Sequence, residues 1–158
     1  MEATQQKIRC QNQIKALLDT TTKKELYLLI RERELKRLIV TVEECQENSP
    51  TLEVALSAIV KERLSLQETF PALSTVDPTD STQLRIERLE QTLIYKLSNS
   101  IGKLQKMNRF RAGNPILYAQ IFIDLIDASC LGSPSKRLSR AERAAFVTDL
   151  ALRASRPA

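Results

Sequence analysis

The chain has 158 residues, of which 42% are hydrophobic and 27% are charged, and its formal net charge is +5. Histidine is absent, which excludes Ser/His and Cys/His nucleophilic sites, a histidine general base and histidine metal ligands. Only three glycines and 4% aromatic residues favour helices over a turn-rich sheet. We therefore expect an all-α protein, a compact multi-helix bundle of about five to six helices with no sheet.

The charge is divided unevenly along the chain. Residues 1–80 carry 11 basic and 13 acidic side chains, whereas residues 81–158 carry 13 basic and 6 acidic ones. The net charges are −2 and +7, so attraction for anions should lie in the second half. A loop rich in proline, serine and threonine at 71–81 separates the halves. We expect a single helical domain over 1–158, and this loop leaves open a division into subdomains 1–70 and 82–158.

Three helices are predicted before this loop. The first, at residues 3–18, is weakly amphipathic. The second begins at the capping-box spacing of Thr22 and Glu25 and runs to about residue 47. Its apolar positions predict a seam for a neighbouring helix, formed by Leu28, Leu35, Leu38, Val42 and Cys45. Pro50 suits the first position of a third helix. Its expected buried side consists of Leu52, Leu56, Ile59, Val60 and Leu64.

The fourth predicted helix, between Asp80 and Asn114, carries its positive charges on one side. Five cations fall within a strip about 80° wide and about 32 Å long. The two acids of the helix, Glu87 and Glu90, point away from the strip. Apolar residues occupy the opposite side, namely Ile86, Leu89, Leu93, Leu97, Ile101 and Leu104. The charge continues into the following loop. The candidate nucleic-acid-binding residues are Arg85, Arg88, Lys96, Lys103, Lys106, Arg109 and Arg111.

Tyr95 lies in the same strip and has two interpretations. Its ring could stack on a nucleic-acid base, but a partly buried tyrosine is the stronger prediction. The cations also have a second interpretation, as a solvated face that keeps the protein soluble.

The last two predicted helices follow a break at residues 113–115. The fifth, at 115–130, is apolar over most of its circumference, so we expect it at the centre of the bundle. Its expected core residues are Ile116, Leu117, Ile121, Phe122, Leu125 and Ile126. Ser139 and Glu142 have capping-box spacing, which predicts a sixth helix to about Ala154.

The cysteines and the apolar segments bear on the compartment. Cys10, Cys45 and Cys130 are far apart and lie within apolar helical patterns, so we expect reduced packing residues. The first residues lack the basic and then apolar run of a secretory signal, and no stretch reaches about 18 consecutive apolar residues. We expect a cytoplasmic protein with no membrane partner.

Catalytic and cofactor motifs find no support in the sequence. Two carboxylate pairs have helical spacing and could hold Mg²⁺, but each lacks a companion motif; the pairs are Glu43 with Glu47 and Asp124 with Asp127. We expect surface or packing roles for both. Neither a glycine-rich phosphate loop nor a CxxC zinc pair is present. We predict that the protein is not an enzyme and has no metal or cofactor. A carboxylate enzyme using Mg²⁺ is the weakest alternative.

The basic helix, the helical core and the missing catalytic set favour a non-catalytic subunit of a larger nucleoprotein complex. Such a subunit would bind the backbone of RNA or single-stranded DNA with low sequence specificity and would contact other protein subunits. In size, helicity and basicity the chain is similar in class to the small helical subunits of CRISPR interference complexes.

The alternative function is a protein-binding adaptor. The long amphipathic helices, and the stretch 104–108 that precedes an apolar helix, resemble flagellar-type secretion chaperones. That resemblance implies capture of an amphipathic partner segment in leucine-rich grooves, with weak salt dependence.

Overall fold

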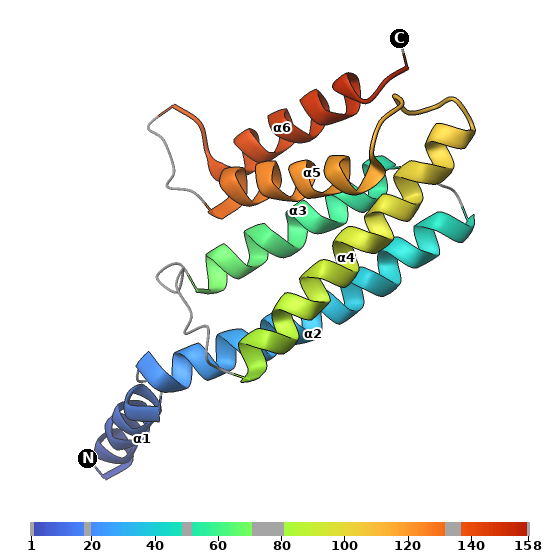
Figure 1. The fold of residues 1–158 in the computed structure, drawn as a ribbon. Coiled ribbons are helices and arrows are strands. Elements are labelled where there is room, and N and C mark those ends of the chain that lie inside the picture. The colour runs from blue at the N-terminus through green and yellow to red at the C-terminus, as the bar shows by residue number, and fades with distance from the viewer. Residues whose placement is uncertain (1, 18–19, 49–51, 71–80, 132–136, 158) are drawn as a thin grey trace.

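The computed structural model describes residues 2–17, 20–48, 52–70, 81–131 and 137–157. Within these ranges the chain forms six α-helices and no strand, which confirms the all-α prediction (Figure 1). The helices are α1 (Glu2–Leu17), α2 (Thr20–Asn48), α3 (Leu52–Thr69), α4 (Ser81–Lys106), α5 (Pro115–Leu131) and α6 (Arg140–Ala154).

The predicted helix starts meet different outcomes. The capping box of α6 is confirmed: the backbone N–H of Ser139 donates to Glu142 Oε2 at 2.7 Å, and the backbone N–H of Glu142 donates to Ser139 Oγ at 3.2 Å. The cap at Thr22 is wrong, because α2 already begins at Thr20. The predicted starts at Pro50 and Asp80 lie outside the described residues.

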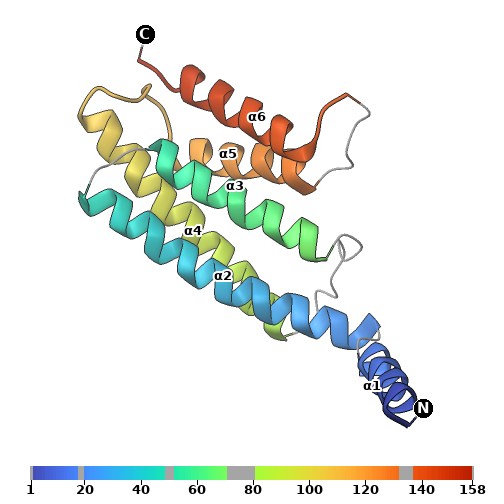
Figure 2. The same ribbon diagram turned by 180° about the vertical axis from the view of Figure 1, so that it is seen from behind.

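The bundle is built from pairs of helices that lie side by side. α2 packs along α4, α4 packs on α5, and α3 contacts both α2 and α5 (Figures 1 and 2). α6 covers α5 and one side of α3. α1 extends away from the other helices at the amino-terminal end, and its residues 2–9 are exposed. None of the described helices combines the length and the apolar character that crossing a membrane requires.

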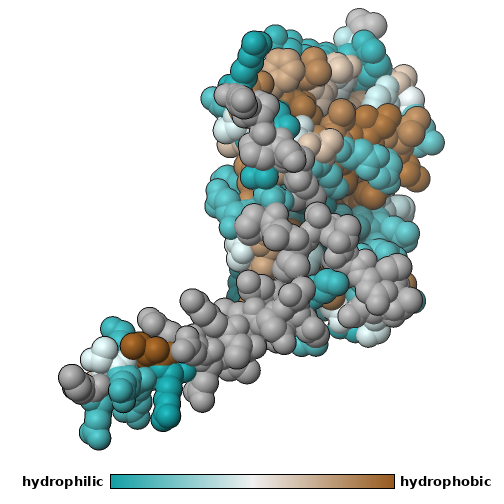
Figure 3. Space-filling view, turned by 90° about the vertical axis from the view of Figure 1, so that its left-hand side faces the viewer, coloured by the Kyte–Doolittle hydropathy of each residue, from teal (hydrophilic) through white to brown (hydrophobic). Residues whose placement is uncertain are grey.

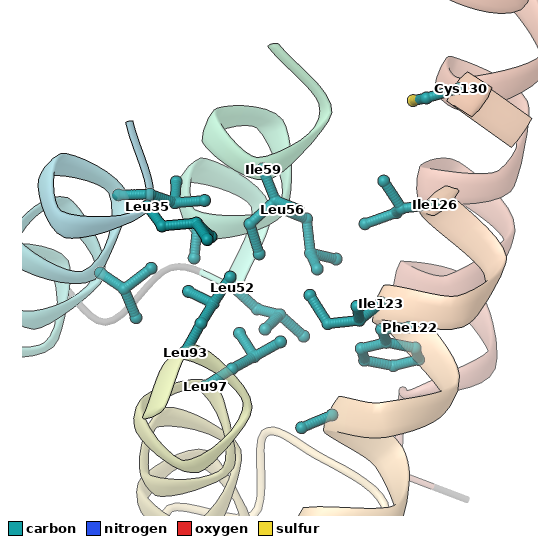
Figure 4. Close-up of a cluster of buried hydrophobic side chains, with 14 of the residues drawn as sticks. Leu35, Leu52, Leu56, Ile59, Leu93, Leu97, Phe122, Ile123, Ile126 and Cys130 are labelled. Carbon is teal, nitrogen blue, oxygen red and sulfur yellow. The ribbon is translucent and has the colours of Figure 1, made fainter. Parts of the chain in front are cut away.

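The hydrophobic core lies where α2, α3, α4 and α5 meet (Figure 4). α2, α3 and α4 contribute the sides that their apolar periodicity predicts. The least exposed side chains of the core include Leu35, Leu56, Ile59, Leu93, Leu97, Ile101 and Ile126. The core therefore combines helices from both sides of the 71–81 loop. The division into subdomains 1–70 and 82–158 stays a prediction.

The prediction for α5 is wrong for four of its six expected core residues. Ile116, Leu117, Ile121 and Leu125 are 43–58% exposed, whereas Phe122 and Ile126 are buried. The reason is the position of α5 at the edge of the bundle. Its inner side packs on α3, α4 and α6, and its outer side meets no other described helix.

Candidate nucleic-acid interface

The outward side of α4 presents the predicted cations in two rows. At about 100° per residue, Arg88, Tyr95 and Lys106 lie within about 20° of one another along the crest of the helix. Arg85, Lys96 and Lys103 form a second row about 80–100° from Tyr95. This second row lies toward α2, because α2 contacts α4 along its length and supplies acidic partners to two of its members.

Two predicted site residues are engaged by acids of α2. Arg85 Nε lies 3.1 Å from Glu32 Oε1, and Lys96 Nζ lies 2.6 Å from Glu43 Oε1. The hydrogen bond from Arg85 lowers the pKa of Glu32, and the hydrogen bond to Glu43 raises the pKa of Lys96. The basic strip is therefore free of acids in its own helix but partly neutralised by a neighbouring helix.

Arg88, on the crest, is exposed and has no acidic partner among the described residues, and the two lysines at the end of α4 lie beyond the end of α2. The partners in both ion pairs are 53 residues apart, because α2 and α4 run parallel in constant register (Figure 1). In this register Asn48, the last residue of α2, corresponds to Ile101, so Lys103 and Lys106 lie beyond the end of α2. Among the described residues, neither Lys103 nor Lys106 has an acidic partner, and both are exposed.

The corner after α4 carries the other two predicted site residues. The chain leaves the helix through Asn108, whose φ of 55° lets the backbone N–H of Arg109 donate to Leu104 O at 2.8 Å. The backbone N–H of Arg111 donates to Ser155 O at 2.7 Å, which ties the corner to the end of α6. Both arginine side chains are exposed, and no described acid pairs with them. Lys103, Lys106, Arg109 and Arg111 are called the basic corner below.

Hydrogen bonds from side chains to backbone carbonyls hold the basic corner in shape. Gln105 Nε2 donates to Arg111 O at 2.9 Å and to Gly113 O at 3.0 Å. Tyr118 Oη donates to Ala112 O at 3.0 Å, and the Tyr118 ring packs edge-on against Phe110. Phe110 is buried, so this aromatic pair anchors the corner in the core.

Tyr95 differs from its stronger prediction. The side chain is 58% exposed rather than partly buried, since it lies on the crest of α4 with no helix above it. An exposed aromatic ring between Arg88 and Lys106 is available for stacking.

The comparisons with known proteins add no assignment. No family model, curated protein or solved structure matches this chain. The function must therefore be argued from the residues and their geometry.

A buried charge cluster, which the sequence did not predict, lies on the inner side of α4. Arg63 of α3 is fully buried, and its guanidinium Nη2 donates to Glu90 Oε1 and Oε2 at 2.8 and 2.7 Å. Its Nε donates to Asp127 Oδ1 at 2.7 Å, and its Nη1 donates to Glu62 Oε2. Arg31 of α2 also reaches Glu90, at 2.9 Å. These five residues, from four helices, are called the Arg63 cluster.

The Arg63 cluster has one acid more than it has bases, which affects its pKa values. Burial would lower the pKa of Arg63, but the three neighbouring carboxylates raise it, so the guanidinium stays charged. Burial raises the pKa of Glu62 and of Asp127 above their ordinary values. Glu62 Oε1 is buried and has no hydrogen-bond partner among the residues that the structure describes. We therefore expect Glu62 to be the acid of the cluster whose negative charge is least stabilised.

Three of the four carboxylates in the predicted pairs have surface or packing contacts, as expected, and the side chain of Glu47 lies outside the described residues. Asp127 binds Arg63, Asp124 accepts a hydrogen bond from Gln120 at 2.9 Å, and Glu43 pairs with Lys96. In the part of the chain that the structure describes, no group of three or more acidic or cysteine side chains is arranged so that it could hold a metal ion. Cys45 and Cys130 are free cysteines, and burial, followed by the Asp127 charge, raises the pKa of the Cys130 thiol to about 11.

Proposed function

We propose that the protein is a non-catalytic helical subunit that binds the phosphate backbone of RNA or single-stranded DNA through the basic corner. The observation that carries the proposal is the register of α2 and α4. Acids of α2 engage Arg85 and Lys96, whereas the four cations beyond the end of α2 have no acidic partner among the described residues. Four exposed cations on adjoining segments offer phosphates a site that no internal anion competes for.

The proposed contact surface is shorter than the predicted strip and includes an aromatic ring. Lys103 and Lys106 are one helical turn apart, and Arg109 and Arg111 follow them directly. Tyr95 lies two and three turns before these lysines and can stack on a base, which adds affinity without sequence preference. Phosphate contacts and stacking together favour a flexible single strand over a rigid duplex.

The first test is a fluorescence-anisotropy titration of the protein against single-stranded RNA, single-stranded DNA and duplex over a salt series. Four engaged cations predict a slope of log K against log salt of about −3 on single strands. Charge reversal by Lys103→Glu with Lys106→Glu should weaken binding and reduce the slope by about 1.4. No measurable binding at low salt would overturn the proposal.

A matched control separates the basic corner from net charge alone. Lys7→Glu with Arg9→Glu makes the same change in net charge, on exposed residues of α1 at the opposite end of the bundle (Figure 1). This control variant should lose much less affinity than the α4 variant. Equal losses in both variants would mean that diffuse charge, rather than a site on α4, causes the binding.

The adaptor alternative has one observation in its favour, the exposed apolar surface of α5 and α6. Association through apolar surface depends weakly on salt, whereas phosphate binding depends on it steeply. A protein partner retained at high salt, together with no binding to nucleic acid at low salt, would favour the adaptor.

A further inference from the structure

The outer sides of α5 and α6 expose a group of large apolar side chains. On α5 these are Ile116, Leu117, Ile121 and Leu125, and on α6 they are Phe146 and Leu150. Their exposed fractions run from 43% to 66%. Figure 3 shows hydrophobic residues gathered over the upper end of the molecule, where Figure 1 places α5 and α6. The six side chains are called the α5–α6 face.

The size of the α5–α6 face matches one half of a protein interface. At roughly 200 Å² for one large side chain, six that are about half exposed amount to roughly 500–700 Å² of apolar surface. A standard interface buries about 800 Å² on each partner. Monomeric proteins seldom expose a contiguous apolar patch larger than this α5–α6 face.

The pattern on α5 is compatible with its own copy. Leu117, Ile121 and Leu125 follow one another at intervals of four residues, so they form a line along the outer side of the helix. Asp124 is the one charged residue on that side. It accepts a hydrogen bond from Gln120, and the two residues lie along one edge of the apolar line. Reversing the direction of this helix leaves the apolar line in register, because the line is symmetric about Ile121.

We propose that a second copy of the chain covers the α5–α6 face in an antiparallel, two-fold symmetric dimer centred near Ile121. Leu117 would then contact the partner's Leu125, and Ile121 would contact the partner's Ile121. Gln120 would lie opposite the partner's Asp124, so an amide rather than a second carboxylate meets each acid. Both faces are covered at once, as a closed isologous interface requires.

Sedimentation equilibrium of the full chain over a concentration series tests the dimer. Ile121→Asp should weaken dimerisation by about a hundredfold or more, because it places two charges at the apolar centre of the interface. The matched control is Val40→Asp on α2, which alters a residue that is 52% exposed and should leave the dimer unchanged. Circular dichroism confirms that both variants fold.

Cysteine and charge substitutions test the orientation. Ile121→Cys should form an intermolecular disulfide under mild oxidation, since its side chain would lie on the symmetry axis. Val40→Cys should form no more disulfide-linked dimer than the wild type does. Gln120→Glu should loosen the dimer by about tenfold or less, because a carboxylate at this position faces both the partner's Asp124 and the same new carboxylate of the partner.

A monomeric wild type at high concentration would overturn the proposal. A dimer that survives Ile121→Asp would overturn it too, because the contact would then use another face. A dimer with no disulfide at position 121 would refute the antiparallel register.

Discussion

The Arg63 cluster and the basic corner lie on opposite sides of α4 and use the same kinds of charged residue in contrasting ways. On the inner side, Glu90 meets two arginines at 2.7–2.9 Å in a largely buried site. On the outer side, Lys103 and Lys106 face solvent and have no described acidic partner. A buried charge needs its protein partners for the fold, whereas an exposed charge is solvated by water and remains available to a ligand.

This contrast predicts a separation of effects. Substitutions in the Arg63 cluster should change the stability of the fold, because they leave charges buried without compensation. Substitutions in the basic corner should change affinity for anions and leave stability almost unaltered.

The largest expected effect is the replacement of Arg63. Arg63→Met leaves three carboxylates without their shared guanidinium, and this should lower the free energy of unfolding by about 3–5 kcal/mol. Lys103→Met, the exposed counterpart, should change it by less than about 0.5 kcal/mol. Urea unfolding followed by circular dichroism measures both values.

A graded variant sharpens this test. Arg63→Lys keeps one charge but cannot donate to three carboxylates in the same planar geometry, so its stability should lie between those of the wild type and Arg63→Met. Equal urea midpoints of unfolding for Arg63→Met and Lys103→Met would show that the buried cluster contributes nothing to stability.

The next effect concerns two pairs of cations on α4, one beyond the end of α2 and one that acids of α2 engage. Lys103→Glu with Lys106→Glu should weaken binding to a single strand by about tenfold near physiological salt. Arg85→Glu with Lys96→Glu makes the same charge change where α2 already supplies acids, so its loss should be smaller. Anisotropy titrations of both variants under one buffer compare them. A larger loss for the second pair would move the site toward the middle of α4.

The sequence predicts the α4 surface better than it predicts the Arg63 cluster. Periodicity alone places Ile86, Leu93 and Leu97 inside and Lys103 and Lys106 outside, because it requires only the geometry of one helix. The acids that engage Arg85 and Lys96 could not be foreseen, since they depend on the register of two helices that are far apart in sequence.

The sequence did contain one signal for the buried cluster. Arg63 falls on the same side of α3 as Leu56, Ile59 and Leu66, all of which are buried. An arginine within an apolar stripe requires buried acids from other helices. Which residues provide these acids depends on tertiary packing. The same limit explains the error at α5, because an apolar circumference does not reveal which side of a helix is left uncovered.

A smaller effect should appear in the pH dependence of stability. Burial raises the pKa of Glu62 above its ordinary value of 4.5, so the folded chain holds a proton that the unfolded chain releases. Stability should therefore fall as pH rises from about 4.5 through the folded pKa, and should then level off. Glu62→Gln should remove this part of the fall while keeping an acceptor for Arg63.

Unfolding free energies of the wild type and Glu62→Gln, measured from pH 4 to pH 8, test this expectation. The variant should gain stability relative to the wild type as pH rises, and a matched exposed change, Glu68→Gln, should not. Parallel pH profiles for the wild type and Glu62→Gln would mean that Glu62 is not the group that carries the surplus charge of the cluster.

The smallest effect would come from removing the acid that engages Lys96. Glu43→Gln takes away the anion that lies 2.6 Å from Lys96 Nζ, so less negative charge beside this lysine opposes the approach of a phosphate. Affinity for a single strand should rise by about two- to threefold at low salt, and the salt slope should become steeper by less than about 0.7, the value for one fully engaged cation. Glu44→Gln is the matched control, because it makes the same charge change on an exposed neighbour of α2. Equal gains in the two variants would mean that net charge rather than Lys96 is responsible, and no gain in either would confine phosphate binding to the basic corner.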